Sequence, residues 1–284
     1  MIIPRLLRRA RLENRELDHD PNITMLHMIG LEKFETIEQC TVRNMEMIAR
    51  FRHLSNDLSG VHDKFAASAF DRHMSGWDGD WLASRGHRSR IIPQAYRILD
   101  LNPGPLFFVT IVHPKWEIAE GCLRSSNIHA AKQWLRRRLQ QMKRRIVAIG
   151  GFECSLRIDQ PKIAWAGHFH FVVAGAPYDE LREALTIEAH YLTTRYSKPV
   201  VIQPIGDLAS RIGYSTKRVV NQNVAYRGRN GRQQRRQLPL ALKHQIESDL
   251  WLLSLRAGDR TFLYGCRHHH GTLVETTRRM TSPT

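Results

Sequence analysis

Two histidines separated by one residue mark the most chemically suggestive segment of the chain. His168 and His170 flank Phe169 within the apolar run Gly167–Val173. On a β-strand, side chains alternate between the two faces, so both imidazoles point one way and Phe169 points to the packed side. Two neutral imidazoles on one face can share a divalent cation. The alternative is a pair of histidines on a solvated sheet face, and the triplet by itself does not distinguish the two.

A carboxylate in the preceding segment can complete such a site. A tight turn centred between Gln160 and Pro161 places Glu153 directly across from His168 in a hairpin, on the same face. Two imidazoles and one carboxylate leave coordination positions open for water and a substrate oxygen, and Mn²⁺ or Mg²⁺ suits this mixed set. The alternative role for Glu153 is a charge that keeps an edge strand soluble.

A tyrosine and several cations follow on a predicted helix, Leu208 to about Val219. Tyr214 and Lys217 are three residues apart and therefore adjacent, with Arg211 and Arg218 beside them. A phenol has a pKa of about 10, so its attack on phosphorus requires nearby cations to stabilise the phenolate. We predict that Tyr214 is a nucleophile, that Lys217 stabilises the charge, and that both arginines contact nucleic acid. The alternative is a partly buried tyrosine with its hydroxyl at the surface.

Three other tyrosines compete for the nucleophile role: Tyr191, Tyr196 and Tyr226. Tyr196 lies just before a predicted strand, where the geometry for an in-line attack is poorer. One tyrosine alone is therefore well placed, which predicts a single-tyrosine enzyme.

The segments that must position these residues predict an α+β protein. Their order is β-α-β-β-α-β followed by a helix, which is typical of a ferredoxin-like split βαβ antiparallel sheet with its helices packed on one face. In that topology the first and third strands are central, and the second pairs with the third. The predicted elements are a strand at Phe107–Val112, a helix from about Ser126 to Ile146, strands at Val147–Arg157 and Ala164–Val173, a helix at Tyr178–Leu192, a strand at Pro199–Ile205, and the helix that carries Tyr214.

We expect three parts along the chain. Residues 1–102 form an N-terminal extension with one amphipathic helix, Phe34 to Leu54, followed by a loop through Arg90. The turn signal Asn102–Pro105 opens the central domain, residues 103–220. Residues 221–284 hold a basic, turn-rich stretch and a helix at Leu240–Leu255, with a further strand expected within Thr261–Leu273.

The bulk composition favours a polyanionic partner. The formal net charge is +16, from 43 basic and 27 acidic residues, and the pI is near 10.3. Each Lys or Arg near a phosphate releases condensed counterions, so the charge favours nucleic acid binding over a merely basic soluble surface. Flexible basic loops contact phosphates without reading sequence. On that basis we expect nucleic-acid contacts from Arg227, Arg229, Arg232, Arg235 and Arg236, with a solvated linker as the alternative.

Other features argue against several classes of protein. Four widely spaced cysteines form no CxxC pair, which is typical of a reducing cytoplasm and not of a disulfide framework or zinc ribbon. The apolar run Met1–Leu7 is too short for an export signal or a membrane span. No phosphate-binding P-loop motif is present, so no ATPase or helicase module is expected. The histidines at 268–270 point in diverging directions after Cys266, and we interpret them as incidental.

Three short motifs, in this order, resemble those of HUH endonucleases. They are the strand Phe107–Thr110, the His-Phe-His triplet at 168–170, and Tyr-x-x-Lys from Tyr214 to Lys217. The tyrosine follows the histidines, which resembles rolling-circle replication initiators and related transposases. In conjugative relaxases the tyrosine lies near the N-terminus instead. The segment Val200–Ile205 is also similar to the initiators, and the resemblance covers roughly residues 107–220.

The resemblance implies a metal-dependent nick in single-stranded DNA. His168 and His170, with Glu153 as third ligand, would hold the ion, and Tyr214 would form a 5′-phosphotyrosine and release a 3′-hydroxyl. Residues 103–220 would then be the nicking domain of a plasmid or phage initiator, with a replication origin as substrate and a host helicase as a further partner. A single-strand transposase shares this chemistry. A non-catalytic single-stranded nucleic-acid-binding module is the alternative from another class.

Overall fold

The computed structural model describes residue 36 and residues 38–51, 78–159, 161–187, 198–218, 220–227 and 233–276. Residues 38–51 are helical. The labelled elements are α4 (Trp81–Asp100), β1 (Leu106–Ala119), the 3-10 turn η3 (Leu123–Ser125), α5 (Ile128–Gln140), β2 (Val147–Asp159), β3 (Lys162–Ala174), α6 (Tyr178–Ala184), β4 (Val200–Pro204), α7 (Leu208–Ser215), β5 (Gln222–Arg227), β6 (Gln233–Leu238), α8 (Leu242–Leu253), β7 (Thr261–Tyr264), β8 (Cys266–His269) and β9 (Thr272–Glu275).

The chain divides into two compact units. The first comprises Met1–Pro93 and Leu240–Asp259, and the second comprises Gln94–Pro239 and Arg260–Thr284. In the first unit, Met47 and Phe51 pack against Leu253 of α8 in a small apolar core.

Helix α4 corrects one prediction. The segment through Arg90 was expected to be loop, but it is helical from Trp81. The carboxylate of Asp80 accepts hydrogen bonds from the backbone amides of Leu82 and Ala83 at 2.8 and 3.3 Å. An acidic side chain that satisfies the first free amides starts a helix even where apolar periodicity is weak.

The second unit is built on a sheet whose central strands follow the predicted arrangement. Strands β4, β1, β3 and β2 lie in that order, and each neighbouring pair is antiparallel. The first and third strands are therefore central, as expected, and the α+β class is confirmed. The sheet is larger than expected and is mixed, because β5 pairs with the outer edge of β2 in parallel. Strand β7 pairs with the other half of the same edge, antiparallel.

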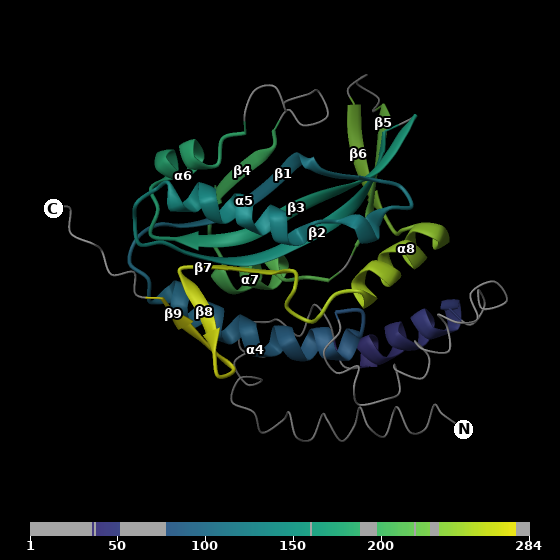
Figure 1. Cartoon of the computed structure of the whole chain (residues 1–284), viewed down its shortest axis with the longest axis horizontal. Coiled ribbons are helices and arrows are strands. Elements are labelled where there is room, and N and C mark those ends of the chain that lie inside the picture. Colours follow the sequence, from purple (N-terminus) through teal and green to yellow (C-terminus); the bar gives the residue numbers. More distant parts are fainter. Residues whose placement is uncertain are drawn as a thin grey trace. The chain divides into compact units, whose positions relative to one another are not determined.

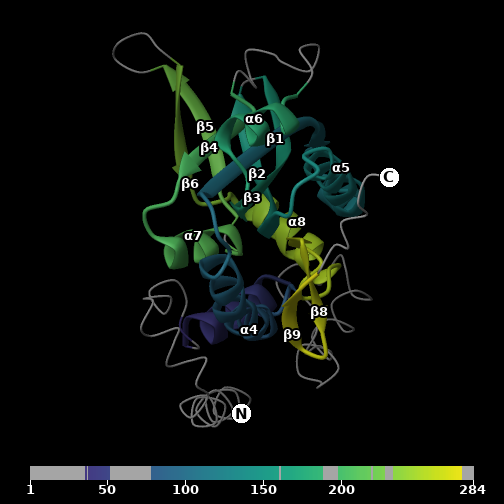
Figure 2. The same ribbon diagram turned by 90° about the vertical axis from the view of Figure 1, so that its left-hand side faces the viewer.

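Helices cover both faces of this sheet, where a single covered face was expected. Figures 1 and 2 show α5 and α6 on one side and α7 on the other. Helix α5 buries Ile128, Ala131, Leu135 and Leu139. Phe169 lies on the packed side as predicted, where it is fully buried with its ring 5.1 Å from that of Phe152.

Several element boundaries differ from the predictions. Strand β1 runs on to Ala119 through an irregularity after Val112, and α5 ends at Gln140. Helix α7 ends at Ser215, because the hydroxyls of Ser215 and Thr216 both donate to the carbonyl oxygen of Ile212. Such side-chain bonds compete with continued helix.

The basic, turn-rich stretch and the C-terminal segment hold more strand than expected. Arg235 and Arg236 lie on β6, which pairs along its length with β5 as a hairpin. Residues 261–275 form three strands, of which β8 and β9 make a separate hairpin. Figures 1 and 2 show β5 and β6 side by side at the end of the sheet where β2 turns into β3.

Candidate metal centre and active site

The pairing of three strands brings the predicted ligands together. Glu153 of β2 lies opposite His168 of β3, which is the register that the hairpin prediction required. On its other side β3 pairs with β1, so that Thr110 lies opposite His170. Paired residues point to the same face of a sheet. The carboxylate, both imidazoles and the Thr110 hydroxyl therefore share one face, which is the face that α7 covers.

The three predicted ligands form a tight and buried group. Oε2 of Glu153 lies 3.5 Å from Nε2 of His168 and 3.9 Å from Nε2 of His170. One ligand atom from each residue can be chosen so that all three lie within 4.8 Å of one another. The side chains of Glu153, His168 and His170 are 7%, 11% and 9% exposed. Among the described residues, this is the group of His, Cys, Asp and Glu that could hold a metal ion.

Hydrogen bonds at the far side of each ring orient both imidazoles. Nδ1 of His168 donates to the backbone carbonyl of Ala166 at 3.0 Å, and Nδ1 of His170 contacts Oγ1 of Thr110 at 2.8 Å. A histidine whose Nδ1 carries the proton presents the lone pair of Nε2 to a metal. Both Nε2 atoms face Glu153. The Ala166 carbonyl requires the proton of His168 to be on Nδ1, and the Thr110 hydroxyl can accept the corresponding proton of His170, so both contacts are compatible with the tautomer that a metal site needs.

The electrostatics of the group also suit a cation. Burial and the neighbouring His168 lower the pKa of His170 to about 3, so its ring is neutral at pH 7. Burial on its own would raise the pKa of Glu153, but the hydrogen bond with His168 and the proximity of His170 and Lys217 outweigh it and lower that pKa. An ionised carboxylate and the neutral His170 imidazole are thus available together, and these are the forms of the two groups that divalent ions bind.

One buried oxygen without a hydrogen-bond partner indicates whether a metal ion fits this group. Oε1 of Glu153 is buried and has no hydrogen-bond partner. Leaving a buried carboxylate oxygen unpaired is costly, and coordination to a cation is one way in which proteins satisfy it. The donor set of two nitrogens and one carboxylate oxygen accepts Mn²⁺ and, with more water in the shell, Mg²⁺. The residues present therefore fit a divalent ion.

Helix α7 places Tyr214 and Lys217 beside this group. The ring of Tyr214 lies 5.0 Å from that of His170 and 5.8 Å from that of Phe108. Nζ of Lys217 lies 3.6 Å from the centre of the Tyr214 ring and also 3.6 Å from Oε2 of Glu153. Tyr214 is 37% exposed, so a ligand from solvent can reach it. The lysine thus connects the tyrosine with the carboxylate, in a way that spacing along the helix could not show.

The predicted nucleic-acid contacts have different positions. Arg211 lies with its guanidinium 4.9 Å from the ring centre of Phe108, at the edge of the site. Arg218 is 1% exposed, so its side chain is buried in the interior of the protein. Arg235 forms an ion pair with Asp159 at 3.3 Å, and Arg236 is exposed.

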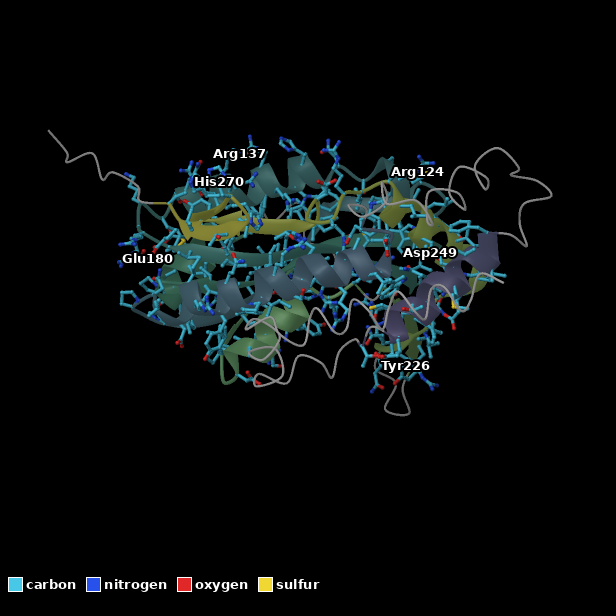
Figure 3. The ribbon with its side chains drawn as sticks, turned by 90° about the horizontal axis from the view of Figure 1, so that it is seen from below. Arg124, Arg137, Glu180, Tyr226, Asp249 and His270 are labelled. Atoms are coloured by element: carbon cyan, nitrogen blue, oxygen red, sulfur yellow. The ribbon has the colours of Figure 1, made fainter. Side chains whose placement is uncertain are left out.

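Some predicted positions lie outside the described residues. They are Arg229, Arg232, Tyr191 and Tyr196, together with the side chain of Arg227. Tyr226, the remaining rival tyrosine, is exposed on β5 and its hydroxyl donates to Oε1 of Gln234 at 2.7 Å. Figure 3 shows it on the side of the unit away from Arg137 of α5.

Three residues that sequence reasoning did not single out support the site. Thr110 contacts His170, and its place in the first motif was the available signal. Gly151 lets α7 approach the sheet, because a Cβ there would lie 2.7 Å from the carbonyl oxygen of Ser215. The guanidinium of Arg260 donates to the backbone carbonyls of Phe152 and Lys217 at 3.5 and 3.4 Å, so it joins β2 to the end of α7. Nothing in the sequence pattern indicated Arg260.

Searches against protein-family models, curated proteins and solved structures find no match for this chain. Among the residues that the structure describes, none of the helices combines the length and apolar character needed to traverse a lipid bilayer.

Proposed function

We propose that this protein is a metal-dependent endonuclease that nicks and rejoins single-stranded DNA through Tyr214. The observation that carries the proposal is the convergence of Glu153, His168 and His170 on one sheet face, with the Tyr214 ring and the Lys217 ammonium in contact with that group. The resemblance of the three motifs to rolling-circle initiators supports replication initiation as the role.

The proposed reaction is a transesterification at phosphorus. The phenolic oxygen of Tyr214 attacks, the bond from phosphorus to the 3′-oxygen breaks, and the phenol's proton is replaced by the phosphoryl group while the departing 3′-oxygen takes up a proton. The number of phosphoester bonds is conserved, so the reverse step rejoins strands without an external energy source. A divalent ion bound by the three ligands supplies Lewis-acid polarisation of a phosphate oxygen.

Lys217 has two roles in this proposal. Its ammonium, 3.6 Å from the Tyr214 ring centre, is positioned to offset the negative charge that develops as the phenolic oxygen attacks. The same ammonium lies near Glu153 and thereby compensates the carboxylate before a metal enters. Arg211, at the rim beside Phe108, is positioned to contact the phosphate backbone of the strand.

A labelled-strand assay tests the proposal. Purified protein is incubated with Mn²⁺ and a pool of single-stranded DNA oligonucleotides of random sequence that carry a dye at the 3′ end. A 5′-phosphotyrosine retains the 3′-side fragment, so the dye should migrate with the protein in a denaturing gel. The same pool labelled at the 5′ end should give only shortened free fragments. EDTA should abolish both products.

Variants assign the roles. Tyr214→Phe should lose the adduct, because it removes the attacking oxygen and keeps the ring contacts. His168→Ala with His170→Ala should lose it through the metal. Tyr226→Phe is the matched control, because it removes one hydroxyl from an exposed tyrosine on β5, and it should react as the wild type does. An adduct that persists in Tyr214→Phe would refute the nucleophile assignment, and binding of the pool with no adduct would favour a non-catalytic binding module.

A further inference from the structure

The hairpin β5–β6 carries a set of side chains that the proposed reaction does not use. The stretch 208–246, which contains it, has several Lys and Arg and no Asp or Glu. Strand β5 pairs with β6 from Gln222↔Leu238 to Arg227↔Gln233. The described β6 residues 234–237 are exposed. This hairpin is therefore a basic two-stranded ribbon whose described β6 side chains lie in solvent, while residues 222–225 of β5 are half-buried.

One face of the ribbon continues the face that bears the metal centre. Arg157 of β2 is in the same alternating set as Glu153, and it lies opposite Asn223 of β5 in the parallel pair. Asn223 in turn lies opposite Gln237 of β6. Because paired residues share a face, Asn223 and Gln237 point to the side of the sheet where Glu153 lies. The ion pair between Arg235 and Asp159 places Arg235 on this face as well.

The chemistry of this face suits the edges of base pairs better than stacked single bases. Two carboxamides and a guanidinium offer donors and acceptors, and bidentate amide–adenine and guanidinium–guanine contacts are the common means of direct sequence readout. Single-strand binding relies on aromatic rings against which bases stack. The described part of the ribbon has one aromatic residue, Tyr226, and it lies on the other face, paired with Gln234.

The size and position of the ribbon also suit duplex DNA. A two-stranded β-ribbon fits the major groove, which is about 12 Å wide. Gln237 is four residues along the sheet and two strands across from Glu153, which is about 16 Å at roughly 3.3 Å per residue and 4.8 Å per strand. That distance corresponds to about five base-pair steps of about 3.4 Å. A duplex segment on the ribbon would thus end near the metal centre.

We propose that Asn223, Arg235 and Gln237 on the β5–β6 ribbon read the sequence of duplex DNA in the major groove, about five base pairs from the site of cleavage. The role in directing cleavage rests on the proposed nicking function, whereas the duplex binding itself does not. The ribbon would then determine which DNA is delivered to Tyr214.

The test is selection from a pool of duplex oligonucleotides with a randomised core, in EDTA so that no cleavage occurs. The wild-type protein should enrich a preferred sequence. Asn223→Ala with Gln237→Ala should bind that sequence about 30-fold or more weakly, because two base contacts are lost together, and should bind random duplex as before. Gln234→Ala removes a carboxamide from the opposite face and should retain the preference. Circular dichroism verifies that each variant is folded.

The outcomes distinguish the two proposals. A wild-type protein that enriches no sequence, or a double variant that retains the preference, overturns the ribbon proposal. Preference lost equally in Gln234→Ala overturns it too, because the face assignment would be wrong. The adduct assay on single-stranded DNA is independent of these results. Absence of the adduct together with a preference that depends on Asn223 and Gln237 would refute nicking and leave duplex readout standing.

Discussion

The hydroxyl of Thr110 provides a sharp test of the metal centre, because Thr110→Val removes one oxygen and keeps the shape of the side chain. The hydroxyl lies 2.8 Å from Nδ1 of His170. A metal-binding His170 must carry its proton on Nδ1 and present Nε2, and the Thr110 oxygen accepts that proton. With valine in its place, Nδ1–H has no partner, and the ring gains from moving the proton to Nε2, where it can bond to Glu153.

Two separate effects of Thr110→Val can be estimated. The His170 side chain is 9% exposed, so an unpaired Nδ1 should lower the free energy of unfolding of the metal-free protein by about 1–3 kcal/mol. Loss of the partner that orients a ligand weakens metal binding by about 10–100-fold. That factor corresponds to about 1.4–2.7 kcal/mol of binding free energy. The second effect should therefore be as large as the first, although no ligand has been removed.

Calorimetric titration with Mn²⁺ measures the affinity, and urea unfolding in EDTA measures the stability. Thr272→Val, an exposed threonine on β9, is the matched control and should change neither quantity. If folded Thr110→Val binds Mn²⁺ as tightly as the wild type, the hydroxyl does not orient His170. If the wild type itself binds no Mn²⁺, the metal centre is refuted.

Three other experiments give further tests. Gly151→Ala would place a Cβ 2.7 Å from the Ser215 carbonyl oxygen and displace α7. The rate of adduct formation should fall by on the order of 100-fold per ångström of displacement. The Mn²⁺ affinity, measured by titration, should be retained. Glu153→Gln should abolish the stabilisation of about 2.7 kcal/mol that Mn²⁺ at 100 times its Kd gives the wild type in urea unfolding. Exposed Cys122 should react with iodoacetamide at pH 8 in the native protein, whereas buried Cys266 should react only after unfolding, because burial raises its pKa to about 12. Between pH 9 and pH 12 the native Cys266 thiol keeps its proton while the unfolded thiol, with a pKa of about 9, loses it, so the free energy of unfolding should fall as pH rises through this range. Equal labelling of Cys122 and Cys266 in the native protein would contradict the structure.

The group of Glu153, His168 and His170 could be predicted because its assembly depends on local geometry. Alternation along a strand places His168 and His170 on one face, and a short turn determines which residue of the preceding strand lies opposite them. Both rules apply over a few residues, so the pairing of Glu153 with His168 could be inferred from the amino-acid sequence alone. The order of strands and helices was accessible for a similar reason, since alternation and helical periodicity are properties of short segments.

The ends of helices could not be predicted where a capping or terminating side chain sets them. Helix α4 begins because Asp80 satisfies its first amides, and α7 ends because Ser215 and Thr216 bond to Ile212. Each effect is one or two hydrogen bonds, too small to change a hydrophobic pattern. The hairpin β5–β6 was missed because β6 is polar on both faces up to Leu238, and polar segments lack the alternation that predicts strands.

The sequence by itself determined which residues share a strand face and hence that two imidazoles and a carboxylate meet. Only the tertiary structure decided what surrounds them. Thr110 and Arg260 reach the site from segments that are remote in sequence, and Lys217 contacts both Tyr214 and Glu153 because Gly151 lets the helix lie close to the sheet. Contacts of this kind arise when separate elements pack, so their geometry is a property of the assembled core and is encoded in no single segment.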